Sequence, residues 1–125
     1  MTKNEENHSE PVWNQAELLE RVDNDQELLI ELLAIFQEDF PRTVKSLEEA
    51  VAARDLKNTA SLSHTLKGML SNLGGTRAAA AAAKLEKLAS SAEGKAPLKD
   101  AFDALQREAA SLVPELDAYI VGVRR

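Results

Sequence analysis

The chain contains no cysteine and few aromatic residues, which make up 4% of its 125 positions. The absence of cysteine excludes a disulfide framework and thiolate chemistry. Because aromatics are scarce, the core must be built from leucine, alanine and valine, and this mixture, with glutamate and lysine outside, favours helices over sheets. A chain of this length is expected to form one domain with a single core.

The chain also lacks an excess of basic residues and any long apolar run. Its formal net charge of −6 argues against a nucleic-acid partner and against anionic membranes, because both reward clustered lysine and arginine. No apolar run approaches the roughly 20 residues of a membrane span, and we expect no signal peptide at the start. These features predict a cytoplasmic protein with neither a membrane nor a nucleic-acid partner.

The amino-terminal residues are polar and precede a short helix. Residues 1–11 end in Pro11, and we interpret them as a disordered leader. Asn14 is a good N-cap for a short helix that stops near residues 22–24. We expect residues 12–125 to form the folded domain.

Four longer segments show the three- and four-residue apolar spacing of amphipathic helices. Their expected ranges are 25–53, 56–73, 76–92 and from 97 to at least 120. Pro41 makes the first of them either one kinked helix or two nearly collinear ones, and Asp55 and Thr76 are the expected N-caps of the next two. Since the connections are short, the sequence predicts an all-α fold, an antiparallel up-and-down four-helix bundle with a short additional N-terminal helix.

The helix expected over 56–73 places His64 away from its apolar side. At about 100° per residue, the apolar stripe centres roughly opposite the histidine. The stripe consists of Leu56, Leu62, Leu66, Leu70 and Leu73, with Thr59 in a gap. The face of the histidine itself is shared by Lys57, Ala60, Ser61, Lys67, Gly68 and Ser71. Most of these neighbours are small, which is unusual around a plain surface histidine and favours docking and chemistry. On this geometry alone, a functional and an ordinary surface histidine both remain open.

Gly68 adds to the case for function at His64. A glycine inside a helix costs about 1 kcal/mol relative to alanine, and this one does not end the helix, since the apolar pattern continues to Leu70 and Leu73. A residue four positions on lies directly beside the imidazole. Close packing against a neighbouring helix is the alternative explanation, but Gly68 is expected on the outward face. Access for another protein is therefore the favoured interpretation.

Together these residues resemble the signature of the histidine-containing phosphotransfer (HPt) domain. The resemblance rests on the stretch Ser63-His64-Thr65-Leu66-Lys67-Gly68, followed by Gly74 and the pair Leu85-Glu86. Upstream, Leu18-Leu19-Glu20-Arg21, Asp25-Gln26-Glu27-Leu28-Leu29 and Phe36 also resemble the family, so the resemblance covers roughly residues 12–120. The His-x-x-Lys-Gly pattern by itself is weak, whereas its combination with the later glycine and the Leu-Glu pair is specific. Ser63, where alanine is common, and Met69, where a small residue is usual, are minor departures.

The resemblance implies a phosphorelay carrier rather than an enzyme with its own ATP-binding or hydrolytic machinery. A phosphoaspartate on a response-regulator receiver domain would donate to His64, which would pass the phosphoryl group to another receiver. A hybrid sensor histidine kinase is a second candidate partner. Lys67 could balance charge on the phosphoryl oxygens. No cofactor or metal is expected in this chain, because the family leaves Mg²⁺ to the receiver.

The residues expected to contact the partner share the helix face of His64, and the resemblance adds Glu86 to them. The expected docking residues are Lys57, Ala60, Ser61, Ser71 and Glu86. For Glu86, a plain surface charge and a contact near the imidazole both remain open. We expect a monomer, because one bundle closes its own core.

Two other functions are weighed against the carrier. A histidine kinase dimerisation-type domain usually has an acidic residue and a Thr-Pro after its histidine, where this chain has Thr65 and Lys67-Gly68. It would also need an ATP-binding domain, for which no length remains. A non-catalytic helical scaffold or adaptor, with His64 incidental, is the second alternative. Acid-labile phosphorylation from a receiver separates the carrier from the scaffold, and autophosphorylation from ATP would indicate the kinase class.

Overall fold

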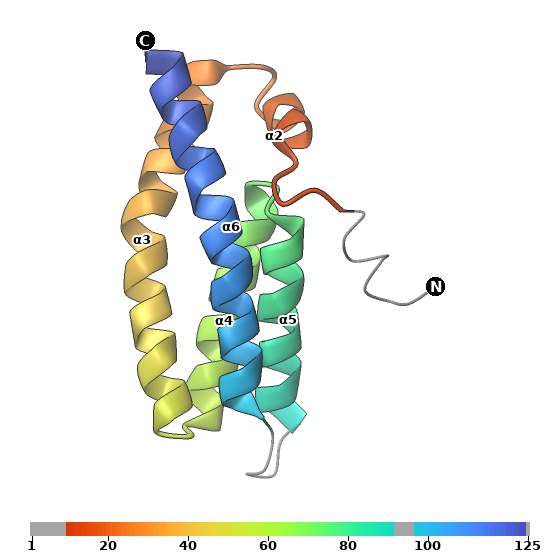
Figure 1. The fold of residues 1–125 in the computed structure, drawn as a ribbon, viewed down its shortest axis with the longest axis vertical. Helices are drawn as coiled ribbons and strands as arrows, with labels where there is room; N and C mark the ends of the chain where they lie inside the picture. Colours follow the sequence, from red (N-terminus) through yellow and green to blue (C-terminus); the bar gives the residue numbers. More distant parts are fainter. Residues whose placement is uncertain (1–9, 92–96, 125) are drawn as a thin grey trace.

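The described part of the protein is a bundle of helices. The structure, a computed structural model, describes residues 10–91 and 97–124. Its helices are α2 (Gln15–Arg21), α3 (Gln26–Ala52), α4 (Leu56–Asn72), α5 (Thr76–Ser91) and α6 (Leu98–Arg124) (Figure 1). The four long helices run alternately up and down, and α2 lies at one end. This confirms the predicted all-α bundle with a short additional N-terminal helix, while residues 1–9 of the expected leader lie outside the described residues.

Both interior prolines are accommodated within single helices. Helix α3 continues through Pro41, so Gln26–Ala52 form one helix and not two, and α6 continues through Pro114. Both prolines are exposed, so water can reach the backbone carbonyl that each leaves without a helical partner. None of the described helices is both long enough and apolar enough to cross a membrane.

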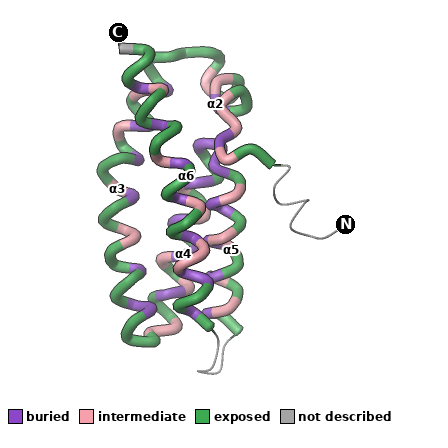
Figure 2. The backbone as a smooth tube through the Cα atoms, in the orientation of Figure 1, coloured by how far each residue is buried: buried purple, intermediate pink, exposed green. Residues whose placement is uncertain are grey.

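Leucine and alanine dominate the core, as the composition predicts, whereas the expected valine contributes little and the phenylalanines and Trp13 are buried there as well. Buried positions recur along the inner side of each long helix (Figure 2). Helices α4 and α5 make the most extensive contact in the bundle. Several buried residues on these two helices are small, namely Ser63, Ala78, Ala79 and Ala82. Small side chains allow helix axes to approach closely, and this close pairing brings the outer edge of α5 next to His64.

The segment around α2 holds the carboxyl end of α4 in place. Trp13 donates from Nε1 to the carbonyl of Leu73 at 2.7 Å, and the amide of Asn14 donates to the carbonyl of Gly74 at 2.9 Å. Gly74 has φ +86°, and a Cβ there would lie 2.7 Å from the oxygen of Asn14, so only glycine fits. Arg21 adds bonds to the last carbonyls of α4 at 3.1 and 3.2 Å, which complements the helix dipole.

Two of the three predicted N-caps are confirmed and one is wrong. Asn14 accepts from the amide of Glu17, and Asp55 accepts from the amide of Asn58, both at 3.2 Å. Thr76, however, is already the first residue of α5. The carbonyl of Gly75 accepts the first bond of that helix, from Ala79, at 2.8 Å. A Cβ at Gly75 would meet Leu112 of α6 at 2.8 Å, so packing against α6 favours glycine at the helix start.

Candidate functional site

His64 lies on the solvent side of α4, as its place on the helical wheel predicts. Its side chain is 67% exposed, whereas Leu66 and Leu70 of the same helix are completely buried. Ser63 is completely buried as well, although the wheel did not include it in the apolar stripe. The backbone of α4 thus separates a packed inner face from an outer face that presents the imidazole.

A carboxylate from the neighbouring helix contacts both His64 and Lys67. Glu86 of α5 places Oε2 3.0 Å from His64 Nδ1 and Oε1 2.9 Å from Lys67 Nζ. The preceding residue, Leu85, is completely buried and fixes the start of the Glu86 side chain. Of the two roles left open for Glu86, the structure shows the contact with the imidazole.

The Glu86 carboxyl is held in its ionised form. The hydrogen bond from the Lys67 ammonium lowers the pKa of Glu86 below its ordinary value, partial burial opposes this effect, and the His64 ring adds to the lowering. The side chain of Glu86 is 25% exposed and that of Lys67 is 36% exposed. Glu86 is therefore a carboxylate throughout the neutral pH range.

An ionised carboxylate fixes which ring nitrogen of His64 carries the proton. A carboxylate can only accept a hydrogen bond, so Nδ1 must donate in the 3.0 Å contact with Glu86. In a neutral imidazole the other nitrogen then keeps its lone pair. The geometry thus leaves the lone pair of Nε2 available on an exposed, oriented imidazole, with the Lys67 ammonium one helical turn away.

The outer face of α4 is open on both sides of the imidazole. A Cβ added at Gly68 would meet no atom within 4 Å. Among the other predicted docking residues Lys57, Ser61 and Ser71 are exposed, and Ala60 is half-buried. In the described residues, no side-chain hydrogen bond or ion pair joins these four to His64, Lys67 or Glu86. The structure therefore brings Glu86 to the imidazole and leaves the others as surface.

An apolar groove beside this face was missed by the sequence reasoning. It lies between α3 and α4, has a volume of about 170 Å³, and is lined in part by Leu32, Ile35, Met69 and Asn72. Leu32 and Ile35 are 39% and 56% exposed. Residues 28, 32 and 35 form a second apolar row on α3 beside its buried stripe. This row has more apolar residues than the buried stripe requires, and it is the sequence signal that could have indicated the groove.

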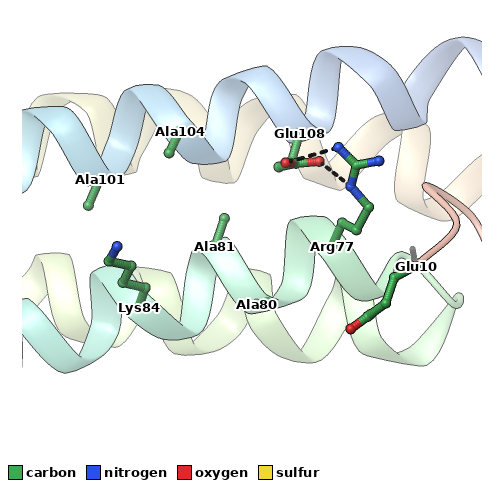
Figure 3. A pocket seen from close by; sticks show the side chains of 8 residues that line it. All are labelled: Glu10, Arg77, Ala80, Ala81, Lys84, Ala101, Ala104 and Glu108. Carbon is green, nitrogen blue, oxygen red and sulfur yellow. Dashed lines mark hydrogen bonds and ion pairs between the residues drawn. The ribbon is translucent and has the colours of Figure 1, made fainter. Parts of the chain in front are cut away.

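A second hollow lies between α5 and α6 and belongs to a different face (Figure 3). Its volume is about 210 Å³, and its lining includes alanines and the ion pair between Arg77 and Glu108 at 3.0 Å. Glu86 points from α5 toward α4, whereas Arg77 points toward α6, so this hollow is not part of the His64 site. Within the described residues, no group of His, Asp and Glu side chains has the arrangement of a metal site.

Comparison with known proteins gives one family. The family model of the Hpt domain matches residues 31–118. This range contains α4 and α5 entirely, and with them every side chain that meets at the imidazole. No curated protein and no solved structure matches the chain.

Proposed function

The chain belongs to the Hpt domain family, and we propose that its His64 carries a phosphoryl group between receiver domains. Members of this family are phosphotransfer carriers that interact with receiver domains and histidine kinases. The observation that supports this most directly is the contact between Glu86 and His64 Nδ1 at 3.0 Å. It orients an exposed imidazole and leaves Nε2 as the nucleophile. The protein would need no ATP-binding or hydrolytic machinery of its own.

The proposed step is a direct transfer between aspartate and histidine. The lone pair of His64 Nε2 forms a bond to the phosphorus, the bond between phosphorus and the aspartyl oxygen of the receiver breaks, and the aspartate leaves as a carboxylate. Such transfers pass through a loose, in-line transition state that needs positioning and charge neutralisation. Lys67 can turn its ammonium from Glu86 toward the phosphoryl oxygens, and Mg²⁺ would be supplied by the receiver. Return of the group to a second receiver is the same step reversed.

The test is incubation of the protein with a panel of phosphorylated receiver domains. We expect acid-labile label to move from some of these receivers to the protein. A protein that takes no label from any receiver would instead be a scaffold or adaptor. Label taken directly from ATP would contradict the carrier and indicate a kinase-type domain.

Replacing Lys67 by alanine should slow the transfer without unfolding the domain. The substitution removes a charge-assisted hydrogen bond to the transferring group, which is worth about 1.5–3 kcal/mol, so single-turnover transfer should slow about 10- to 100-fold. Lys67 is 36% exposed, and its ion pair with Glu86 should contribute no more than about 1 kcal/mol to stability. The measurement is the single-turnover transfer rate, with thermal melting in parallel.

Lys99 provides a matched control for the Lys67 substitution. It pairs with Asp103 at 3.1 Å near the start of α6, so Lys99→Ala also removes one lysine and one ion pair. The single-turnover transfer rate of the Lys99→Ala protein should equal that of wild type. An unchanged rate for Lys67→Ala would show that Lys67 is a solvated charge with no part in the transfer.

We also propose that the docked receiver covers the groove between α3 and α4. Asn72, which lines the groove, lies two turns beyond His64 on the row that includes Gly68, about 12 Å along the helix. A standard interface buries about 800 Å² of each partner, which corresponds to a patch about 16 Å in radius. A receiver centred on His64 therefore reaches the groove, and an apolar side chain of the receiver would fill it.

Replacing Ile35 by lysine should weaken receiver binding and leave the chemistry intact. The side chain is 56% exposed, so the fold should tolerate the change. Loss of an apolar side chain that anchors an interface lowers the binding free energy by more than about 1.4 kcal/mol, which is tenfold in affinity. We expect the receiver concentration at half-maximal rate to rise about tenfold, with little change at saturation. Val121→Lys is the control, because Val121 is 55% exposed but lies near the end of α6. Equal behaviour of the two variants would contradict this docking surface.

We propose further that residues 12–125 act as one monomeric unit in the cytoplasm, preceded by residues 1–11 as a leader. A hybrid sensor histidine kinase is proposed as a second partner. The closed core of the bundle supports the monomer.

A further inference from the structure

We propose that Glu86 determines how long a phosphoryl group stays on His64, by holding a proton on Nδ1 of the phosphorylated ring. The inference rests on the proposed function, in which His64 is the carrier. It concerns the phosphorylated state and not the acceptance of the group. The observation behind it is that the contact to Nδ1 comes from a carboxylate, which bears a full negative charge.

The geometry keeps this carboxylate in place when the ring is modified. Phosphorylation occurs at Nε2, so the 3.0 Å contact between Glu86 Oε2 and His64 Nδ1 remains intact. Glu86 begins next to the completely buried Leu85 and is itself 25% exposed. Lys67 now holds the other carboxylate oxygen at 2.9 Å. A phosphoryl group would draw this ammonium toward its own oxygens and leave the charge of Glu86 less compensated beside the ring.

The charged groups that face the ring come from two helices. Lys67 of α4 and Glu86 of α5 are the charged side chains in its immediate network. In the described parts of α2, α3 and α6, no charged side chain forms a hydrogen bond or ion pair with His64, Lys67 or Glu86. When Lys67 turns to the phosphoryl group, Glu86 is the charged side chain left in contact with Nδ1, and its charge adds to that of the phosphoryl group itself.

The proton on Nδ1 controls how easily the bond between phosphorus and Nε2 breaks. When Nδ1 carries a proton, the ring leaves as neutral imidazole: the incoming oxygen bonds to phosphorus, the electron pair of the broken bond returns to Nε2, and Nδ1 keeps its proton. When Nδ1 has lost its proton, the ring would have to leave as an anion, which is a far poorer leaving group. In hydrolysis, the attacking water gives its proton to the released phosphate or to solvent. Glu86, by favouring the protonated ring, makes the phosphoryl group labile at neutral pH.

The substitution Glu86→Gln separates the charge from the hydrogen bond. The amide oxygen can still accept from Nδ1, but it lacks the negative charge that favours the protonated ring. An opposite charge at this distance shifts a titration by about one pH unit or more. At acid pH both phosphorylated proteins have protonated rings and should lose phosphate equally fast. As the pH rises, the ring of the variant loses its proton first, so its phosphoryl group should survive longer.

The experiment measures loss of label from purified phosphorylated protein between pH 5 and 9, without receivers and with a metal chelator. Because the chain contains two histidines, each variant is made in a His8→Gln background, so that phosphoramidate, a small phosphoryl donor, loads His64 alone. Only the decay rate is compared, so incomplete loading does not affect the result. Glu108→Gln is the matched control, because Glu108 is 28% exposed and is paired with Arg77 at 3.0 Å. It should decay like wild type. A ¹⁵N titration of the phosphorylated ring reads the proton on Nδ1 independently.

We expect decay of the Glu86→Gln protein at neutral pH to be about 3- to 10-fold slower than wild type, with the midpoint of the pH–rate profile about one unit lower. The ¹⁵N titration should show Nδ1 losing its proton at correspondingly lower pH. Superimposed profiles, or faster decay of the variant, would overturn the inference. Failure of the proposed function would appear differently, as a wild-type protein that takes no label from any receiver, whatever the decay rates of the proteins loaded with phosphoramidate.

Discussion

The His64→Gln protein should take up no phosphoryl label from any receiver that labels the wild type. Glutamine offers an amide nitrogen whose lone pair is delocalised into the carbonyl, so it has no nucleophile in place of Nε2. The His64 side chain is 67% exposed, and surface substitutions of this kind usually change stability by less than about 0.5 kcal/mol. The loss of label should therefore occur in a protein that melts like wild type. The measurement is label retained after neutral and after acid quenching.

His8 supplies the control for this substitution, because the chain contains two histidines. His8→Gln should be labelled as fast as wild type, and its label should be lost in acid and stable in base, as for any phosphohistidine. Label that survives His64→Gln, or label that is stable to acid, would place the phosphoryl group on another side chain. Either result would remove the assignment of His64 as the carrier.

Most of the fold could be predicted because it depends on local rules. The spacing of leucines reports a helix period, and caps such as Asn14 and Asp55 act within a few residues of their own position. The start of α5 at residue 76 was predicted correctly, but its cap was misjudged, because Gly75 and not Thr76 precedes the helix. Leu112 of α6 packs against Gly75, and the residues around position 75 do not indicate a contact with a residue so distant in the sequence.

The candidate site was predicted less completely than the fold. A helical wheel relates residues of one helix, so it could place Lys67 and Gly68 near His64. It cannot give the rotation and axial offset of a neighbouring helix, which decide whether Glu86 reaches the ring. The exposed apolar row of α3 was missed for a related reason. Leu32 and Ile35 read as ordinary helix residues until the structure shows that α4 leaves them uncovered.

Gly68 is expected to make the domain less stable than alanine at the same position would. Its place in α4 is helical, and a Cβ there would meet no atom within 4 Å. Gly68→Ala should therefore fit without strain and remove the conformational entropy cost of glycine, which raises the free energy of unfolding by up to about 1 kcal/mol. Thermal or denaturant unfolding measures this gain. A strong destabilisation would show that Gly68 packs against something and that the outer face has been assigned wrongly.

The longer substitution Gly68→Gln should separate stability from function. Its side chain extends into solvent, so the protein should melt no lower than wild type, yet it occupies the space beside His64 that a receiver's active-site loop must enter. Transfer requires the reacting atoms to approach to about 3 Å, and a misplacement of about 1 Å can cost a hundredfold in rate. We therefore expect single-turnover transfer to slow by about a hundredfold. Gly122→Gln is the control, since a Cβ at Gly122 also meets no atom within 4 Å but lies near the end of α6, and it should transfer normally. Normal transfer by Gly68→Gln would mean that the receiver approaches His64 from another direction, with the glycine playing no part in access.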